Sequence, residues 1–410
     1  MWTPRRPDRV RDWAESGAVS LTGRSTGAPV VPPGRAATVA RAQSAWIAEV
    51  TGGAVRLDGA RLLAERAAFT GHRRAGAVSA GGACRLLPTG DGWAAVSCAR
   101  PDDPMLLSAL VGADVEDDPW PAVEAWLREH TGADLAERAD LLGVAAGPVM
   151  VPDIAVPVPP RPRVPRPVAG LRVVDFSALW AGPLCAHLLG LAGARVIKVE
   201  TPSRPDGARR GDPEFYRLLH GGHESVLLDP ALPRDRAALA ALVAAADIVI
   251  EASRPRALIG FGLDAAEFIA HGGTWLSITA YGRDSNRVGF GDDIAAAAGL
   301  VARDGEGPMF VGDAIADPLT GLTAAALAMS APPGGAGKLW DISMTAVVSS
   351  TLDAAENAAP QPVRMGDRWY VATATGSVAI TEPRRRAPRG IAADPGRDTA
   401  AVLGELGIAR

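Results

Sequence analysis

The stretch that decides the fold is residues 171–200, which read LRVVDFSALWAGPLCAHLLGLAGARVIKVE. It opens with a short apolar run, 171–176, of the length and composition typical of a strand. A turn follows, with Pro183 suited to the first position of a helix that Gly193 ends. Residues 195–199 then form a second strand-like run. The pattern predicts a right-handed strand–helix–strand crossover, with a ligand near the carboxyl end of the first strand.

Three more apolar runs continue this alternation of strands and helices. They cover residues 225–229, 247–251 and 275–280, and an alanine-rich helix that begins at Pro233 separates the first two. Alternating strands and helices are typical of a parallel sheet covered by helices on both faces. The sequence therefore predicts an α/β protein with a Rossmann-like parallel sheet.

A smaller α+β domain is expected before this sheet. Alternating runs at 84–88 and 93–99 flank an Asp91-Gly92 step, which is a strong hairpin pattern, and three helical stretches follow them. Seven prolines within 151–167 then predict an extended linker. The expected organisation is a segment at 1–55, the small α+β domain at 56–150, the proline-rich linker at 151–168, a Rossmann-like ligand-binding domain at 169–345 and a shortened segment at 346–410.

Composition narrows the class of function. A net charge of −4 gives no indication of nucleic-acid binding, and three cysteines without paired spacing indicate thiols in a reducing compartment. The charged amino terminus is unlike a signal peptide, and the uncharged run 176–194 contains Pro183, His187 and three glycines, which favours a buried unit over a membrane span. We expect a cytoplasmic protein without metal or membrane contact. No Walker loop or complete G-x-G-x-x-G is present.

Several motifs together resemble the class III CoA-transferase family of CaiB/BaiF type. This group includes formyl-CoA transferase, carnitine CoA-transferase and the alpha-methylacyl-CoA racemases. The shared motifs are the AGP turn at 181–183, the VIKVE strand at 196–200, EASRPRALIGFGLD at 251–264, Asp317 and Gly321 in a D-x-x-x-G helix start, and KLWDISM at 338–344. An SG-x-x-x-LTG segment at the start of the chain is found late in the family, so the parts stand in a permuted, truncated or degenerately duplicated order.

The resemblance implies a nucleophilic carboxylate at Asp293, in VGFGDDIAAAAGL at 288–300. An ionised aspartate can attack a thioester and form an aspartyl-CoA intermediate. The alternative is that Asp292 or Asp293 only caps a helix that begins at Ile294, which is a common role for aspartate.

The resemblance also implies a set of CoA contacts. The turn residues Trp180 and Ala181 would face the thioester, with Trp180 standing where formyl-CoA transferase has a glutamine. Lys198, Arg254 and Arg256 could hold the phosphates of CoA, and solvated surface charge is the alternative for the two arginines.

The leading hypothesis is a CoA-transferase that acts on an acyl-CoA and a carboxylic acid, with a homodimer as its assembly. A catalytically weak or inactive CoA-binding relative is the second hypothesis, because Trp180 and the HGGHES run at 220–225 depart from the family pattern. An acyl-CoA racemase is the third and needs two proton-transfer groups, for which His271 is the nearest upstream histidine to Asp293.

Overall fold

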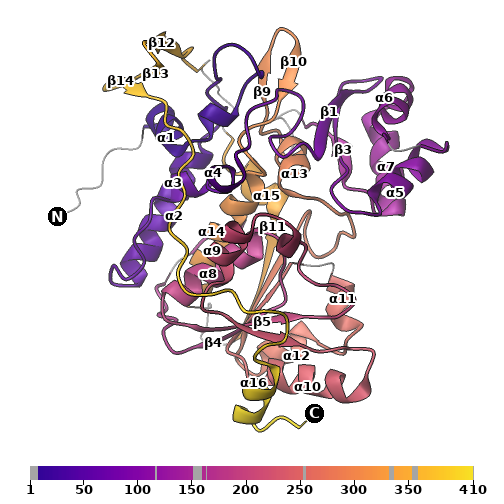
Figure 1. Cartoon of the computed structure of the whole chain (residues 1–410), viewed down its shortest axis with the longest axis vertical. Coiled ribbons are helices and arrows are strands. Elements are labelled where there is room, and N and C mark those ends of the chain that lie inside the picture. The colour runs from indigo at the N-terminus through magenta and orange to yellow at the C-terminus, as the bar shows by residue number, and fades with distance from the viewer. Residues whose placement is uncertain are drawn as a thin grey trace.

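The computed structural model of the chain describes most of its length (Figure 1). Arg254 and the greater part of the proline-rich linker lie outside the described residues. The described residues are 8–115, 118–150, 159–162, 164–252, 255–331, 337–352 and 359–409.

A six-stranded parallel sheet forms the centre of the protein, as the sequence predicts, and the fold is α/β. Its strand order is β11-β8-β7-β4-β5-β6. The first strand begins one residue later than predicted, although the carbonyl of Leu171 already accepts a ladder bond from Arg195 at 2.8 Å. The sixth strand lies beyond residue 300, where the sheet was not expected to continue. The strands are β4 (Arg172–Asp175), β5 (Arg195–Glu200), β6 (Glu224–Leu227), β7 (Ile248–Glu251), β8 (Thr274–Thr279) and β11 (Lys338–Ser343).

Helices bury both faces of this sheet. Successive side chains of a strand point to opposite faces, so that in β4 Val173 belongs to one core cluster and Val174 to the other. Burial on both faces explains the nearly continuous apolar runs of the sequence. The helices are α8 (Ala181–Leu191), α9 (Pro213–His220) and α14 (Ala316–Ala328) on the first face, and α10 (Pro233–Ala244), α12 (Ala265–Ala270) and α16 (Thr399–Glu405) on the second.

The first seventy residues share the core of α8 and α14. Trp13, Ile47 and Leu63 are fully buried in the same apolar cluster as Leu184 and Leu322. This segment therefore packs as part of the large unit. Its elements are α1 (Arg9–Ser16), η1 (Val19–Leu21), α2 (Ala36–Val50), α3 (Gly59–Leu62) and α4 (Ala67–Thr70).

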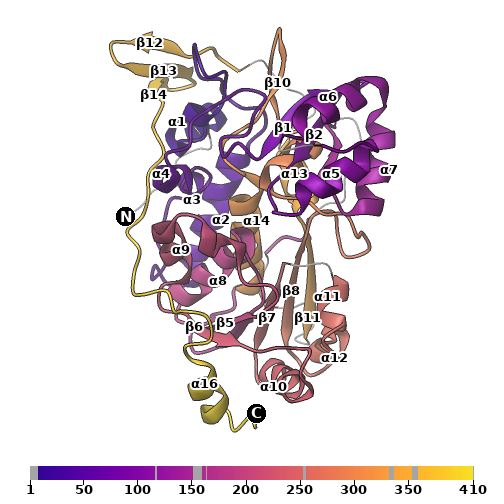
Figure 2. The same cartoon turned by 45° about the vertical axis from the view of Figure 1, so that its right-hand side comes forward.

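The smaller α+β unit lies beside this core, next to α13 (Gly291–Ala297) (Figure 2). The predicted hairpin is present, and a third strand joins it in an antiparallel sheet of order β1-β2-β3. The elements are β1 (Cys84–Pro88), β2 (Trp93–Ser97), α5 (Asp103–Val111), α6 (Trp120–Glu129), α7 (Gly132–Leu142) and β3 (Ala146–Pro148).

Two short antiparallel sheets and three short helices complete the described secondary structure. A two-stranded sheet follows α13, and a three-stranded sheet packs on α1 near the carboxyl terminus. The elements are η2 (Gly207–Arg210), α11 (Pro255–Ile259), β9 (Ala302–Asp304), β10 (Gly307–Met309), α15 (Met344–Ser349), β12 (Val363–Met365), β13 (Arg368–Thr373) and β14 (Gly376–Ala379).

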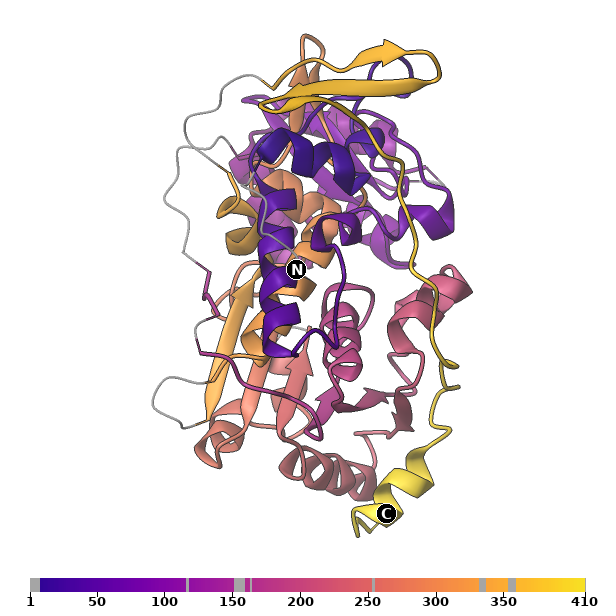
Figure 3. The ribbon, with the colours of Figure 1, turned by 90° about the vertical axis from the view of Figure 1, so that its left-hand side faces the viewer.

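An extended strap, residues 380–398, runs down the side of the molecule from β14 to α16 (Figure 3). At its start the Thr381 N–H donates to the Ala14 carbonyl at 2.9 Å. In its middle Arg386 forms a two-pronged ion pair with the buried carboxylate of Glu65. The strap thereby ties the amino-terminal segment to the parallel sheet.

Close contact between α8 and α14 depends on Gly321. A Cβ at this position would lie 2.6 Å from the carbonyl oxygen of Ala181, which is closer than real Cβ contacts. We therefore expect Gly321→Ala to lower the free energy of unfolding by about 1–3 kcal/mol, measured by denaturant titration. Gly404→Ala in α16 is the matched control, because a Cβ there meets nothing within 4 Å. It should be neutral or stabilising by up to about 1 kcal/mol, and equal effects of the two substitutions would contradict this account.

Candidate active site

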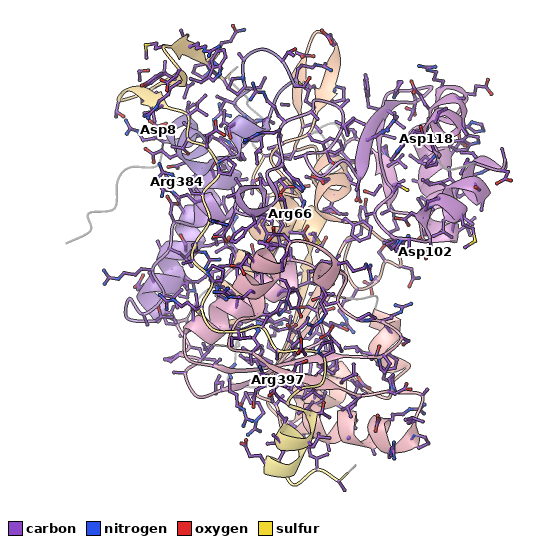
Figure 4. All side chains as sticks on the ribbon, viewed as in Figure 1. Asp8, Arg66, Asp102, Asp118, Arg384 and Arg397 are labelled. Carbon is purple, nitrogen blue, oxygen red and sulfur yellow. The ribbon has the colours of Figure 1, made fainter. Side chains whose placement is uncertain are left out.

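Four buried or half-buried charged groups meet at the amino ends of α13 and α14. They are Arg66, Asp292, Asp313 and Asp317, and we call them the carboxylate cluster. Arg66 follows α3 and lies near the middle of the molecule, between the amino-terminal segment and the parallel sheet (Figure 4). Three carboxylates thus share the field of one guanidinium group.

Arg66 forms a two-pronged ion pair with Asp313. Its Nε donates to Asp313 Oδ2 at 3.0 Å and its Nη2 donates to Oδ1, while Nδ1 of His72 lies 3.2 Å from Oδ1. Asp313 is fully buried, and burial acts to raise the pKa of a carboxyl group. The charge and hydrogen bonds of Arg66 outweigh this effect and hold the pKa of Asp313 below its ordinary value.

Asp292 and Asp317 have no such side-chain partner among the described residues. The Ala314 N–H donates to Asp292 Oδ1 at 2.8 Å. The backbone N–H of Ala181 favours the charged form of Asp317. Burial, opposed by Arg66, raises the pKa of Asp292 to about 6 and that of Asp317 to about 7. Both groups exchange protons near neutral pH, as acid–base and nucleophilic carboxylates do.

The backbone is strained on both sides of this cluster. Leu179, with φ 69°, lies two residues before Ala181, and Ala314, with φ 46°, donates to Asp292. They are the only non-glycine residues with positive φ among those that the structure describes. Strain of this kind persists where the surrounding structure enforces it, and it is concentrated at functional sites.

Asp293, the predicted nucleophile, faces the hairpin of the small unit. Its Oδ1 accepts hydrogen bonds from Ser97 Oγ at 2.7 Å and from the Phe290 N–H at 3.0 Å. Because α13 begins at Gly291 rather than at Ile294, Asp293 lies in the first turn and satisfies a free N–H of the helix start. Its side chain is only 2% exposed, and burial raises its pKa to about 7. The structure therefore shows a capping role for Asp293.

Trp180 and Ala181 begin α8 beside the carboxylate cluster. The Trp180 ring is 2% exposed, with the Arg66 guanidinium 5.1 Å from its centre and the Phe215 ring packed edge-on at 5.3 Å. The Ala181 N–H favours the charged form of Asp317. The predicted site turn and the carboxylates thus form one site.

A groove of about 840 Å³ lies at the carboxyl ends of β4 and β5. The chain order reverses between β4 and β7, which is the position where open α/β sheets bind ligands. Phe176 follows β4 in the groove, and Leu141 of the small unit, 80% exposed, lines it from the other side. The rest of its wall comes from Asp140, Val199, Glu200, Thr201, Ser203, Arg204, Ala257, Leu258, Gly260, Phe261 and Asn286.

The predicted phosphate contacts are only partly described. The Lys198 ammonium is buried, 2.9 Å from Asp206 Oδ2 and 2.8 Å from the Ser177 carbonyl oxygen to which it donates, so its charge is already paired. Arg254 lies outside the described residues, as does the side chain of Arg256. Their contacts to CoA remain predictions, and Arg204 is a described cation that does line the groove.

Sequence reasoning did not identify Arg66, His72, Asp313 or Ser97 as site residues. Arg66 and His72 belong to no motif, and 247 residues separate Arg66 from its partner Asp313. Two patterns pointed toward the cluster, namely the Asp317-x-x-x-Gly321 helix start and the motif at 288–300 that contains Asp292.

Comparisons with known proteins show the family to which the chain belongs. The sequence profile of CoA-transferase family III matches residues 168–379, which is more than half of the chain. The chain belongs to CoA-transferase family III.

Relatives within this group are CoA-transferases by name. The chain is 32% identical over 199 residues to a succinyl-CoA–D-citramalate CoA-transferase of Chloroflexus aurantiacus, covering 44% of this chain and 50% of the relative. It is 29% identical over 216 residues to a succinate–glutarate CoA-transferase of Agrobacterium fabrum, covering 47% and 54%. The chain thus spans about half the length of these relatives. A CaiB/BaiF family protein of Brucella suis is similar in structure, with a TM-score of 0.45 and 26% identity over 51% of this chain and 66% of that chain.

The described residues contain neither a membrane-spanning helix nor a group of side chains suited to a metal ion. None of the helices in the described ranges combines the length and apolar character needed to cross a membrane. Over the same ranges, no three His, Cys, Asp or Glu side chains are grouped in a way that could hold a metal ion.

The raised pKa of Asp317 makes a testable statement about stability. The charged form is disfavoured in the folded state, so Asp317 destabilises the fold increasingly as pH rises from about 4 to 7. Asp317→Asn should therefore stabilise the protein at pH 8 relative to wild type and change little near pH 4. The slope between these limits is at most about 1.4 kcal/mol per pH unit. Denaturant titrations of both proteins across this range measure the difference.

Asp304 supplies a control, because its pKa is lowered in the folded protein whereas that of Asp317 is raised. Its bond to Arg24 holds its pKa at about 2, so the charged form is favoured in the folded state. Asp304→Asn should lose stability above pH 4, where the wild-type carboxylate is ionised. A pH-independent difference between wild type and Asp317→Asn would contradict the assigned environment of Asp317.

Proposed function

We propose that this chain transfers CoA between an acyl-CoA and a carboxylic acid through an aspartyl-CoA intermediate. The observation that carries the proposal is the group of carboxylates with raised pKa values at the turn after the first strand of the sheet. Membership of the family and the names of the relatives support it, since both named relatives are transferases that act with dicarboxylic acids. Succinyl-CoA and glutarate are therefore the first substrates to test.

The groove at the sheet edge is the proposed site for the nucleotide end of CoA. It lies on the same edge of the sheet as Trp180 and Ala181, because the groove residue Phe176 and this turn both follow β4. Arg204 lines the groove and is the described cation that could pair with a phosphate there. Contacts from Arg254 and Arg256 are proposed from the sequence alone. The thioester would then point toward the carboxylate cluster.

The proposed reaction balances without a further reagent. A carboxylate oxygen of the protein attacks the thioester carbonyl carbon, the carbon–sulfur bond breaks, and CoA leaves as a thiolate. The thiolate attacks the aspartyl carbonyl of the resulting anhydride and releases the donor acid, which leaves an aspartyl-CoA thioester. The acceptor carboxylate repeats the two steps in reverse and restores the aspartate.

Asp293 is the candidate nucleophile from the sequence and needs a rearrangement for this role. Its carboxylate would have to exchange its bonds to Ser97 and Phe290 for the thioester and become exposed. Donors at the amino end of α13 would then have to stabilise the oxyanion.

A catalytically weak CoA-binding relative is the second candidate function. The burial of Trp180 and of Asp293 favours it, because neither side chain presents a reactive face to solvent. Binding of acyl-CoA without formation of a new CoA ester would identify this function. A racemase, the third candidate, would instead incorporate deuterium at the α-carbon of an acyl-CoA in heavy water.

Cytoplasmic location and a homodimer are also part of the proposal. The unpaired cysteine usage supports the location. Light scattering at micromolar concentration tests the dimer, and a monomer would refute it.

The decisive measurement for transfer is mass spectrometry of CoA esters. We expect the full chain, given succinyl-CoA and glutarate, to produce glutaryl-CoA and succinate, and heat-denatured protein to produce neither. Donors of other chain lengths, tested in parallel, cover acyl groups that the relatives do not name. Absence of any new CoA ester from all donor–acceptor pairs would overturn the proposed transferase.

A further inference from the structure

We propose that the buried ion pair between Lys198 and Asp206 is a positioning device for the turn at residues 177–180, which we call the strained turn. The pair clamps this turn in its conformation and so sets where Trp180 and the Ala181 N–H meet the thioester. The inference rests on the proposed transferase function, because that function places the thioester at this turn. It assigns to Lys198 a role other than the predicted contact with a CoA phosphate.

The ion pair holds the strained turn at two backbone groups. Lys198 Nζ donates to the Ser177 carbonyl oxygen at 2.8 Å, and Asp206 Oδ1 accepts from the Leu179 N–H at 3.0 Å. The two side chains are joined to each other, with Nζ 2.9 Å from Asp206 Oδ2, and both are buried. Each charged group therefore binds its partner and one backbone group of the same turn.

Leu179 has a backbone conformation that its own side chain does not explain. Its φ of 69° lies in the left-handed region, which residues with a Cβ disfavour and which glycine adopts readily. The Leu179 side chain is 41% exposed, so burial in the core does not hold the residue there. Its N–H is bonded to the buried carboxylate of Asp206, and this bond opposes return of the residue to an ordinary φ.

Ser177 is fixed from two neighbouring strands of the sheet. Asp175 of β4 accepts at Oδ1 from the Ser177 N–H at 2.9 Å and from Ser177 Oγ. Lys198 of β5 holds the carbonyl oxygen of the same residue. A Cβ on Gly182 would lie 2.1 Å from the Cβ of Ser177, so the strained turn folds back closely against the start of α8.

The loop that carries Asp206 is itself anchored to the sheet. The Asp206 N–H donates to Glu200 Oε1 at 2.8 Å, and Arg209 forms a two-pronged ion pair with the same carboxylate. This loop also contains Arg204, which lines the groove. The clamp thereby connects the proposed nucleotide site to the turn at the thioester.

The alternative role for the pair is stabilisation of the fold alone. A buried ion pair is poorly suited to that role, because the cost of removing two charges from water can exceed their mutual attraction. Apolar side chains of similar volume would stabilise the core at least as well. They would provide neither a donor for Ser177 nor an acceptor for Leu179, so the contacts with the strained turn distinguish the two roles.

Thermal unfolding tests the clamp without reference to activity. The variant Lys198→Met/Asp206→Ala removes both charges together, so that neither remains buried and unpaired. Leu179→Gly should raise the thermal midpoint of wild type, because glycine adopts a φ of 69° without strain. In the double variant the turn can relax, so Leu179→Gly should leave the midpoint unchanged or lower it, since glycine loses more conformational entropy on folding. A rise of equal size in both backgrounds overturns the clamp.

Transfer kinetics with succinyl-CoA and glutarate separate positioning from stability. Lys198→Met/Asp206→Ala should reduce kcat by about 10²-fold, because small displacements of reacting groups have effects of this size. The KM for succinyl-CoA should stay within about threefold, because the groove is untouched. Lys198→Met/Asp206→Asn should recover at least about tenfold in kcat over the alanine variant, because asparagine can still accept from the Leu179 N–H. Equal kcat values of the two variants overturn the inference.

An ion pair at the other end of the same strand is the matched control. Arg195 begins β5, and its Nε lies 2.7 Å from Glu224 Oε2. Arg195→Met/Glu224→Gln should leave kcat within about twofold of wild type, because this pair does not contact the strained turn. A loss of kcat in this control equal to that in Lys198→Met/Asp206→Ala would show a general effect on the sheet and overturn the positioning role.

Failure of the proposed function is distinguishable from failure of this inference. Absence of transfer by wild type with every donor overturns the transferase, and the midpoints of the Leu179→Gly proteins then decide the clamp alone. If the alanine variant does not fold, hydrogen exchange of wild type decides, because the Leu179 amide is bonded to a buried carboxylate. We expect this amide to exchange at least about 10²-fold more slowly than in an unfolded chain, and weaker protection overturns the inference.

Discussion

The close packing of α14 against α8 is the constraint on which the rest of the structure depends. Gly321 lets the backbone of α8 approach, and α14 is buried by the parallel sheet on one side and by the amino-terminal helices on the other. The amino end of α14 is thereby held beside the start of α8 and of α13. The carboxylate cluster forms where these three helix starts meet, so the geometry of the site follows from the packing of the core.

The carboxylate cluster contains more negative than positive charge, because three carboxylates lie near one guanidinium group. Asp292 and Asp317 are half-buried, and the guanidinium of Arg66 that lies near them is occupied by Asp313. A protein interior normally pairs each buried charge, because an unpaired one costs several kcal/mol. The core packing supplies the stability that offsets this cost, and the result is carboxylates that ionise near neutral pH, where transfer chemistry operates.

Much of the fold could be predicted from the sequence, and less of the site. Apolar runs and the AGP turn predicted the positions of strands β4 to β8 along the chain and their parallel sheet, because short apolar runs that alternate with helices are typical of a buried parallel sheet. The sharing of one core by Trp13 and Leu322 has no local pattern. For the same reason Arg66 was not identified, since its partner lies in another part of the chain. Asp293 was recognised by motif, but its burial against Ser97 arises only from tertiary packing.

The shared core also decides when, during synthesis of the chain, the amino-terminal helices can reach their native burial. Helices α1 to α4 leave the ribosome first, yet the apolar surface that they bury belongs largely to α8 and α14, which are added much later. Until then Trp13, Ile47 and Leu63 must be shielded in some non-native way. Native burial of the amino-terminal helices therefore waits for α8 and α14, and the strap, which follows them in the chain, then ties the segment to the sheet.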